Sequence, residues 1–97
     1  VYVSRNSNEG FLDLDKIKWP IKVRTRREKD VFRVMGKSEP RKLKKLLIDR
    51  KTDAALRNSL PLFLADDGEI LFIPGIGVSE IAKIEEKTVT ILHFSII

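Results

Sequence analysis

Hydrophobic and polar positions alternate with a period of two residues along several short stretches of this chain, a pattern typical of β-strands. Residues 20–26 (PIKVRTR) have apolar side chains at positions 21 and 23 and basic ones at 22, 24 and 26. We therefore expect a half-buried strand that carries its basic side chains on one face. Residues 31–35 (VFRVM) predict a second short strand, paired with the first.

The second half of the chain predicts further antiparallel strands. Asp67-Gly68 stands between two apolar runs, PLFLA (61–65) and EILFI (69–73), and this arrangement is a strong signal for a β-hairpin. Residues 78–84 and 87–94 are expected to complete the set. The PGIG sequence at 74–77 lacks the third glycine of a dinucleotide-binding loop, so it is interpreted as a turn between strands.

The apolar spacing becomes helical in the middle of the chain, where Leu43, Leu46 and Leu47 share one stripe. The predicted helix covers residues 39–51, with its cap at position 38 or 39 and a proline at 40 in its first turn. A second, short helix is expected after Asp53. Together these elements predict an α+β fold: a small antiparallel sheet of hairpins, one main basic amphipathic helix and a second short helix.

The length of 97 residues suits one domain. Residues 1–10 are expected to be the end of a preceding linker or a short strand, and residues 11–97 to form the domain itself. Because the chain begins without methionine, a domain of a longer protein is expected. No apolar run reaches the roughly 20 residues that span a bilayer, and no signal-peptide pattern opens the chain.

The net charge of +5 conceals a strong asymmetry. Residues 16–51 carry fifteen Lys or Arg and four Asp or Glu, a local net charge of +11. The remaining positions carry four basic and ten acidic residues, a net charge of −6. This concentration predicts a polyanionic partner, with nucleic acid ahead of an anionic membrane. A helix face that is merely solvated by lysines is the alternative interpretation.

The basic residues gather at two predicted places. Lys37 and the run from Arg41 to Lys45 surround the start of the predicted helix, where free backbone N–H groups and cations together would bind phosphate. The basic positions 22, 24 and 26 would form a second row, spaced about 6.6 Å apart along a strand. An edge strand protected by charge from aggregation is the alternative interpretation of this second row, and two adjacent basic segments on different elements favour nucleic acid over it.

Residue types that carry catalysis or bind metals are scarce. There is no cysteine, and the single histidine, His93, lies in an apolar strand without a partner at motif spacing. The acidic residues of the 66–69 turn lack the spacing of a calcium-binding loop. We therefore predict no catalytic residue, no metal site and no cofactor in this chain.

An ordered series of short motifs runs through most of the chain: Arg24 and Arg26, Lys42-Leu43-Lys44, Asp49 and Lys51, Arg57, Pro61-Leu62, and Pro74-Gly75-Ile76. Over residues 11–94 this series resembles the C-terminal domain of bacterial tRNA(Ile)-lysidine synthase. Lys29 stands where that family commonly has glycine, Thr52-Asp53 replaces a frequent aliphatic–proline pair, and Phe72 replaces a frequent tryptophan.

The resemblance implies a tRNA-binding domain that positions the CAU-anticodon isoleucine tRNA by its acceptor stem. In that family a separate N-terminal domain uses ATP, with Mg²⁺, to convert the wobble cytidine to lysidine in the cytoplasm. The predicted nucleic-acid-binding residues are Lys22, Arg24, Arg26, Arg27, Lys37, Arg41, Lys42, Lys45, Lys51 and Arg57.

Two other functions stay open at this point. The chain could be a protein-interaction or homodimerisation module that uses the apolar residues 61–65 and 94–97 as an adhesive edge. It could also be a general basic RNA-binding domain of another translation protein. The first would change mass with concentration, and the second would bind RNA stems without preferring isoleucine tRNA.

Overall fold

The computed structural model describes residues 9–95. Its strands are β1 (Glu9–Asp13), β2 (Lys22–Arg24), β3 (Val31–Phe32), β4 (Arg41–Lys42), β5 (Leu62–Leu64), β6 (Ile70–Ile73), β7 (Gly77–Val78) and β8 (Ile91–Ser95). Its helices are α1 (Leu43–Asp49) and α2 (Ala54–Arg57), with single 3-10 turns at Leu14–Lys16 and Glu80–Ala82. The predicted α+β class is confirmed. Most of the predicted N-terminal segment, residues 1–8, lies outside the described residues.

The main sheet has four antiparallel strands in the order β2-β5-β6-β7. The predicted hairpin is formed by β5 and β6, and Gly68 in its turn has a φ of +90°, a conformation that glycine adopts without steric cost. All four residues of β6 are buried. Since β5 lies between β2 and β6, residues 61–65 do not form the exposed adhesive edge that the interaction-module alternative required.

Two hydrophobic clusters hold the sheet between them. One contains Leu43, Leu46 and Leu47 of α1, which pack against buried residues of β5 and β6. The other contains Leu12 of β1 and Phe72 of β6. The amphipathic stripe predicted for the helix is thus confirmed, and it buries the face that the leucine spacing indicated.

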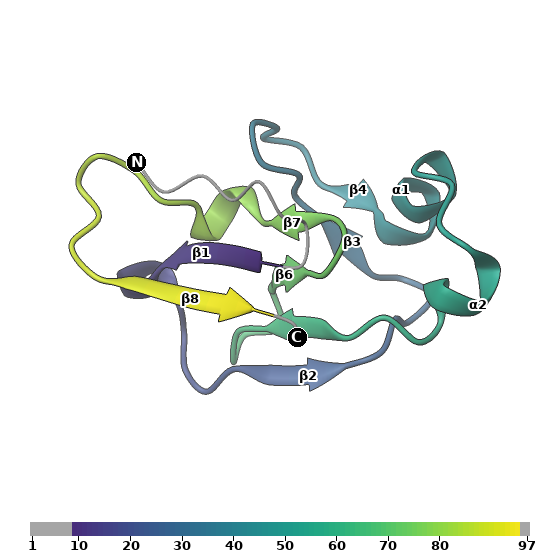
Figure 1. Ribbon diagram of the computed structural model, residues 1–97, viewed down its shortest axis with the longest axis horizontal. Helices are drawn as coiled ribbons and strands as arrows, with labels where there is room; N and C mark the ends of the chain where they lie inside the picture. Colours follow the sequence, from purple (N-terminus) through teal and green to yellow (C-terminus); the bar gives the residue numbers. More distant parts are fainter. Residues whose placement is uncertain (1–8, 96–97) are drawn as a thin grey trace.

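A second sheet consists of β1 and β8, which pair antiparallel from Glu9↔Ser95 to Asp13↔Ile91. Figure 1 shows these two strands side by side, away from the end of the molecule that carries α1 and α2. Gly10 allows β1 to lie close to the main sheet, because a Cβ atom there would be 2.8 Å from the Phe72 ring and 2.9 Å from Val78. The strand predicted over residues 87–94 is confirmed in part as β8.

Two predictions about the basic segment are wrong. The main helix begins at Leu43, because residues 41 and 42 pair as strand β4 with β3. The strand β2 pairs with β5, and β3 takes β4 as its partner, so the predicted pairing of residues 20–26 with 31–35 does not form. The short helix α2 is confirmed, with the Asp53 carboxylate accepting a hydrogen bond from the N–H of Ala55.

Candidate nucleic-acid interface

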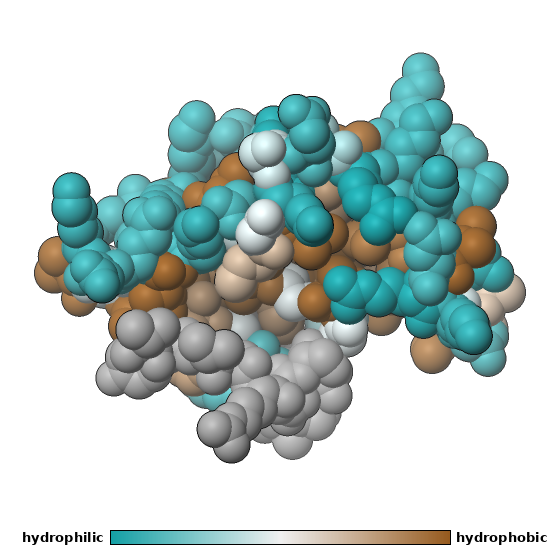
Figure 2. All heavy atoms as spheres, turned by 90° about the horizontal axis from the view of Figure 1, so that it is seen from above, coloured by the Kyte–Doolittle hydropathy of each residue, from teal (hydrophilic) through white to brown (hydrophobic). Residues whose placement is uncertain are grey.

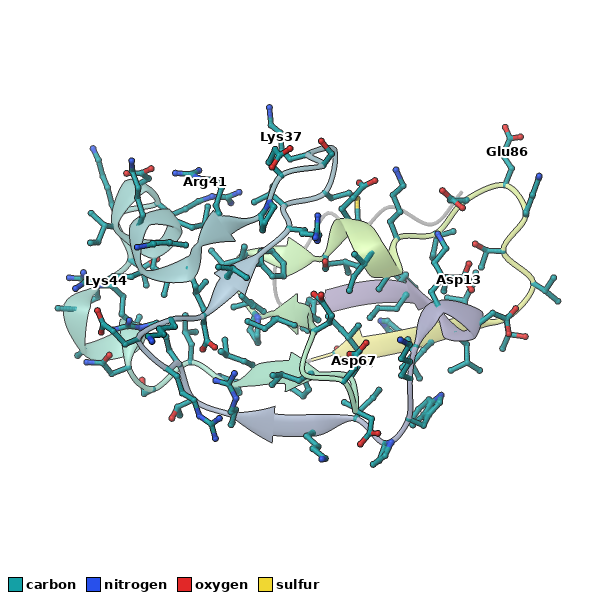
Figure 3. All side chains as sticks on the ribbon, turned by 180° about the vertical axis from the view of Figure 1, so that it is seen from behind. Asp13, Lys37, Arg41, Lys44, Asp67 and Glu86 are labelled. Carbon is teal, nitrogen blue, oxygen red and sulfur yellow. The ribbon has the colours of Figure 1, made fainter. Side chains whose placement is uncertain are left out.

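Positive side chains gather at one end of the molecule. Figure 3 shows Lys37, Arg41 and Lys44 around β4 and α1, whereas Asp13 and Glu86 lie at the opposite end. The basic residues of segment 16–51 and the acidic residues outside it are therefore partly separated in space. Figure 2 shows hydrophilic side chains over the end with α1 and α2, with hydrophobic atoms exposed between them. Ile48 of α1 and Leu56 of α2 contribute apolar surface, with exposed fractions of 49% and 54%.

The loop after β2 is shaped by an ion pair between Arg24 and Asp30. The two guanidinium Nη atoms of Arg24 donate to the two carboxylate oxygens of Asp30, each at 2.8 Å. The same carboxylate accepts the backbone N–H of Arg27 at 2.7 Å, and the Asp30 carbonyl accepts the N–H of Leu43. Asp30 thereby connects the basic loop 25–29 to the start of α1.

This ion pair is shielded from solvent, with exposed fractions of 24% for the Arg24 side chain and 10% for that of Asp30. The hydrogen bond from Arg24 lowers the pKa of the Asp30 carboxyl, and the hydrogen bond to Asp30 raises the pKa of Arg24. Since Arg24 is held by a carboxylate, we interpret it as a residue that supports the loop, whereas the sequence predicted a phosphate contact.

The helix-start phosphate site predicted from the sequence is not formed. Arg41 and Lys42 lie on β4, the N–H of Leu43 already donates to Asp30, and α1 has only seven residues. The predicted row of cations on one strand face is also incomplete, because β2 ends at Arg24 and Arg26 follows it in the loop. The cations remain at the surface, but they are arranged differently.

The predicted site residues separate into two groups among the described residues. Those with a side-chain partner are Lys22 (to Asp66, 3.5 Å), Arg24 (to Asp30), Arg26 (to Asn58, 2.8 Å) and Arg41 (to Asp49). Those without an ion pair or side-chain hydrogen bond in residues 9–95 are Arg27, Lys37, Lys42, Lys45, Lys51 and Arg57. The cations of the second group are therefore more available than those of the first to bind an anionic ligand.

Three residues of this surface are not among the predicted nucleic-acid-binding residues, although Lys44 belongs to the basic run that the sequence placed at the helix start. Asn58 binds Arg26, although 32 positions separate them. Lys44 and Arg50 are exposed beside the predicted residues, and Lys44 lies 3.5 Å from Glu28. Lys44 and Arg50 could have been included from the sequence, because they are basic residues at the start and end of α1. No pattern in the sequence indicated a contact with Asn58.

Lys51 ends α1 in an unusual conformation. Its φ is +55°, in the left-handed region where glycine is the usual residue. The N–H of Thr52 donates to the Leu47 carbonyl at 3.0 Å, and the N–H of Lys51 donates to Ile48 at 2.9 Å. These two bonds form a Schellman motif, which requires the left-handed residue. Lys51 therefore occupies a backbone conformation that is energetically less favourable for lysine than for glycine.

No three His, Cys, Asp or Glu side chains of residues 9–95 gather as a metal site would need. In the same part of the chain, no helix has the length and apolar character needed to cross a membrane. His93, at the other sheet, lies 2.6 Å from Glu9 and stacks on Phe11.

The fold and its surface define a small α+β domain whose unneutralised cations are exposed around one helix and the segments beside it. The family model described as the TilS substrate C-terminal domain matches residues 21–94, and the chain belongs to that family. The tRNA(Ile)-lysidine synthase of Dehalococcoides mccartyi is 36% identical over 91 residues, which are 94% of this chain and 19% of that protein. The enzyme of the same name from Clostridium acetobutylicum is 37% identical over 91 residues, 94% of this chain and 20% of that protein.

Solved structures support the same fold. A crystal structure of a TilS C-terminal domain matches with a TM-score of 0.79 at 23% identity, covering 98% of this chain and 75% of that one. An N-terminal fragment of the phenylalanyl-tRNA synthetase β-subunit from Pyrococcus horikoshii matches with a TM-score of 0.71 at 24% identity, covering 88% and 26%. The chain spans about a fifth of the length of these two curated relatives.

Proposed function

We propose that this chain is the tRNA-binding domain of a tRNA(Ile)-lysidine synthase, and that it positions the CAU-anticodon isoleucine tRNA by holding its acceptor stem. In this proposal a separate N-terminal domain of the same cytoplasmic protein carries the ATP-dependent conversion of the wobble cytidine to lysidine. ATP and Mg²⁺ would be used there. Membership of the family supports the general role, and the exposed cations support RNA as the ligand.

The observation that carries the proposal is the set of exposed lysines that have no acidic partner within residues 9–95. Lys42, Lys45 and Lys51 are exposed on β4, α1 and the turn after it, three consecutive segments of the chain. Phosphate contacts of this kind position an RNA without reading its sequence. An A-form stem suits them, because it is recognised mainly by shape, phosphates and 2′-hydroxyl groups.

Binding of this chain to the CAU-anticodon isoleucine tRNA across a salt series tests the proposal. Each phosphate neutralised should contribute about −0.7 to −0.9 to the log–log slope of affinity against salt. A second tRNA, altered only in its acceptor stem, should bind more weakly. A flat salt dependence would contradict RNA binding, and equal affinity for both tRNAs would contradict the acceptor-stem role.

Charge variants test which surface is used. The double variant Lys42→Gln and Lys45→Gln should lower the magnitude of the slope by about 1.4–1.8. Lys87→Gln is the matched control, since Lys87 is exposed and adjoins Glu86 at the opposite end of the molecule. Equal effects per charge removed would show that net charge alone, and not this surface, determines binding. The mass in solution, measured at several concentrations, tests the homodimer alternative.

A further inference from the structure

Asp30 closes the turn of residues 27–30 in both directions. Its backbone N–H donates to the Arg27 carbonyl at 3.2 Å, and its carboxylate accepts the Arg27 N–H at 2.7 Å. A reciprocal pair of this kind fixes both ends of a segment, as the two bonds of a capping box do at the start of a helix. Glu28 and Lys29, between the two ends, are exposed. The turn is therefore held by these bonds and not by burial of its central side chains.

The same residue attaches the turn to the elements on either side. Both carboxylate oxygens of Asp30 accept from Arg24 at the end of β2, each at 2.8 Å. The Asp30 carbonyl accepts the N–H of Leu43, the first residue of α1, at 2.9 Å. The Asp30 side chain is only 10% exposed and Leu43 is fully buried, so water competes little for these bonds. Asp30 is thus the point at which β2, the basic turn and α1 are joined.

Several cations beside this junction have no partner. Arg27 in the turn, and Lys42 and Lys45 on either side of Leu43 in the chain, are exposed and form no ion pair or side-chain hydrogen bond within residues 9–95. Asp30 sets the place of the turn relative to α1, because the two meet at its carbonyl oxygen. A ligand that must order a flexible cationic side chain on binding loses roughly two- to tenfold in affinity for each one.

The charge of Asp30 acts in the opposite direction. A carboxylate within a cationic surface repels an anionic ligand, and this one also occupies Arg24, which would otherwise be a further cation for that ligand. Charge alone therefore predicts that the surface would bind RNA better without Asp30. The hydrogen bonds of the same residue predict that it would bind RNA worse.

We propose that Asp30 is a positioning residue for RNA binding, and that it strengthens binding although its own charge opposes it. This inference rests on the proposed function. Asp30 does not contact the RNA itself; it holds Arg27 at a fixed place relative to the lysines beside Leu43. An RNA strand then meets cations that are already arranged before it binds, so that less order is created on binding.

Two substitutions make the same chemical change at the same end of the molecule. Asp30→Ala and Asp49→Ala each remove a carboxylate, and each releases an arginine, Arg24 in the first variant and Arg41 in the second. The Asp49 side chain is 49% exposed, and its carboxylate accepts no backbone N–H within residues 9–95. Asp49→Ala should therefore change charge alone, whereas Asp30→Ala changes charge and also opens the turn.

Binding of the CAU-anticodon isoleucine tRNA across a salt series separates the two effects. Charge acts through the slope of log affinity against log salt, so its contribution vanishes when the line is extrapolated to about 1 M salt. Asp49→Ala should steepen the slope by up to about 0.9 and leave the extrapolated affinity unchanged. Asp30→Ala should lower the extrapolated affinity about two- to tenfold.

A control variant separates positioning from loss of stability. Gly10→Ala disturbs the contact of β1 with Phe72, so it should destabilise the domain without touching the turn. At a temperature at which every variant is folded, it should change neither the slope nor the extrapolated affinity. Backbone order parameters of residues 27–29, measured by NMR, should fall from about 0.85 towards 0.6 in Asp30→Ala and not in Gly10→Ala.

Asp30→Asn is the second variant if Asp30→Ala does not fold. Its amide has one acceptor oxygen, so it keeps at most two of the three hydrogen bonds that the carboxylate accepts. The extrapolated affinity should fall in this variant too, to a smaller extent.

The outcomes distinguish this inference from the proposed function. If the unsubstituted chain binds tRNA with a steep salt slope and removal of the Asp30 carboxylate leaves the extrapolated affinity equal or higher, the positioning role is refuted and the proposed function stands. An equal fall in Gly10→Ala would also refute the positioning role, since stability alone would then explain the loss. If the unsubstituted chain shows no salt-dependent binding of tRNA, the proposed function is refuted, and the positioning role with it.

Discussion

Replacing Lys51 by glycine should stabilise this domain, although it removes an ordinary surface lysine. Lys51 holds a φ of +55°, and a left-handed residue other than glycine is strained by about 1–2 kcal/mol. Glycine relieves that strain, but it adds freedom to the unfolded chain worth about 0.4–1 kcal/mol. The balance is a gain of roughly 0.5–1 kcal/mol in the free energy of unfolding, or a rise in melting temperature of about 2–8 °C for a domain of this size.

Thermal unfolding followed by circular dichroism measures this effect, with Lys51→Ala as the matched control. Alanine removes the same charge but keeps the left-handed strain, so its stability should differ from that of the parent by less than about 0.5 kcal/mol. Both variants should lose about 0.7–0.9 from the salt slope of tRNA binding if Lys51 contacts a phosphate. A glycine variant no more stable than the alanine variant would refute the strain argument.

Two further changes test the loop and the sheet contact. Asp30→Asn should lower the free energy of unfolding at neutral pH, since the carboxylate accepts three hydrogen bonds. Because the folded pKa of Asp30 is lowered, its contribution is complete above the unfolded pKa of about 3.9 and is lost as pH falls through the folded value. Urea unfolding at pH 7 and pH 3 should therefore show a smaller difference between parent and variant at the lower pH, and an equal difference would contradict this assignment. Gly10→Ala would place its Cβ 2.8 Å from the Phe72 ring, so a loss of about 1–3 kcal/mol is expected in the same assay, and an unchanged midpoint would show that the ring yields.

The elements that depend on neighbouring residues were predictable from the sequence. The hairpin of β5 and β6 follows from Asp67-Gly68 between apolar runs, and the buried face of α1 follows from the leucine spacing. Both signals act within a few residues, where local geometry and hydrophobic burial agree. The start of α1 was not predictable in the same way. The proline at position 40 favoured an earlier start, but the pairing of β4 with β3 prevailed.

The arrangement of the candidate site depended on contacts between distant residues. A count of charges predicts a cationic surface in residues 16–51, but it does not reveal which cations have partners. Arg24 forms a bidentate ion pair with Asp30, and this contact exists only because the loop folds back on itself. The meeting of Arg26 with Asn58 depends on the packing of α2 beside the loop after β2. Such pairings carry no periodic signal, so sequence patterns alone cannot assign them.

The pairing of β1 with β8 has a consequence for how the domain is made. About 80 residues separate the two strands, and synthesis at about 5–20 residues per second needs roughly 4–16 seconds to add them. During this interval Leu12 has been synthesised, but the strand that holds β1 in place has not. The cluster around Phe72 is therefore complete only after β8 has been synthesised, because Leu92 of that strand packs against it. Chaperones that bind apolar segments of nascent chains have their opportunity in that interval.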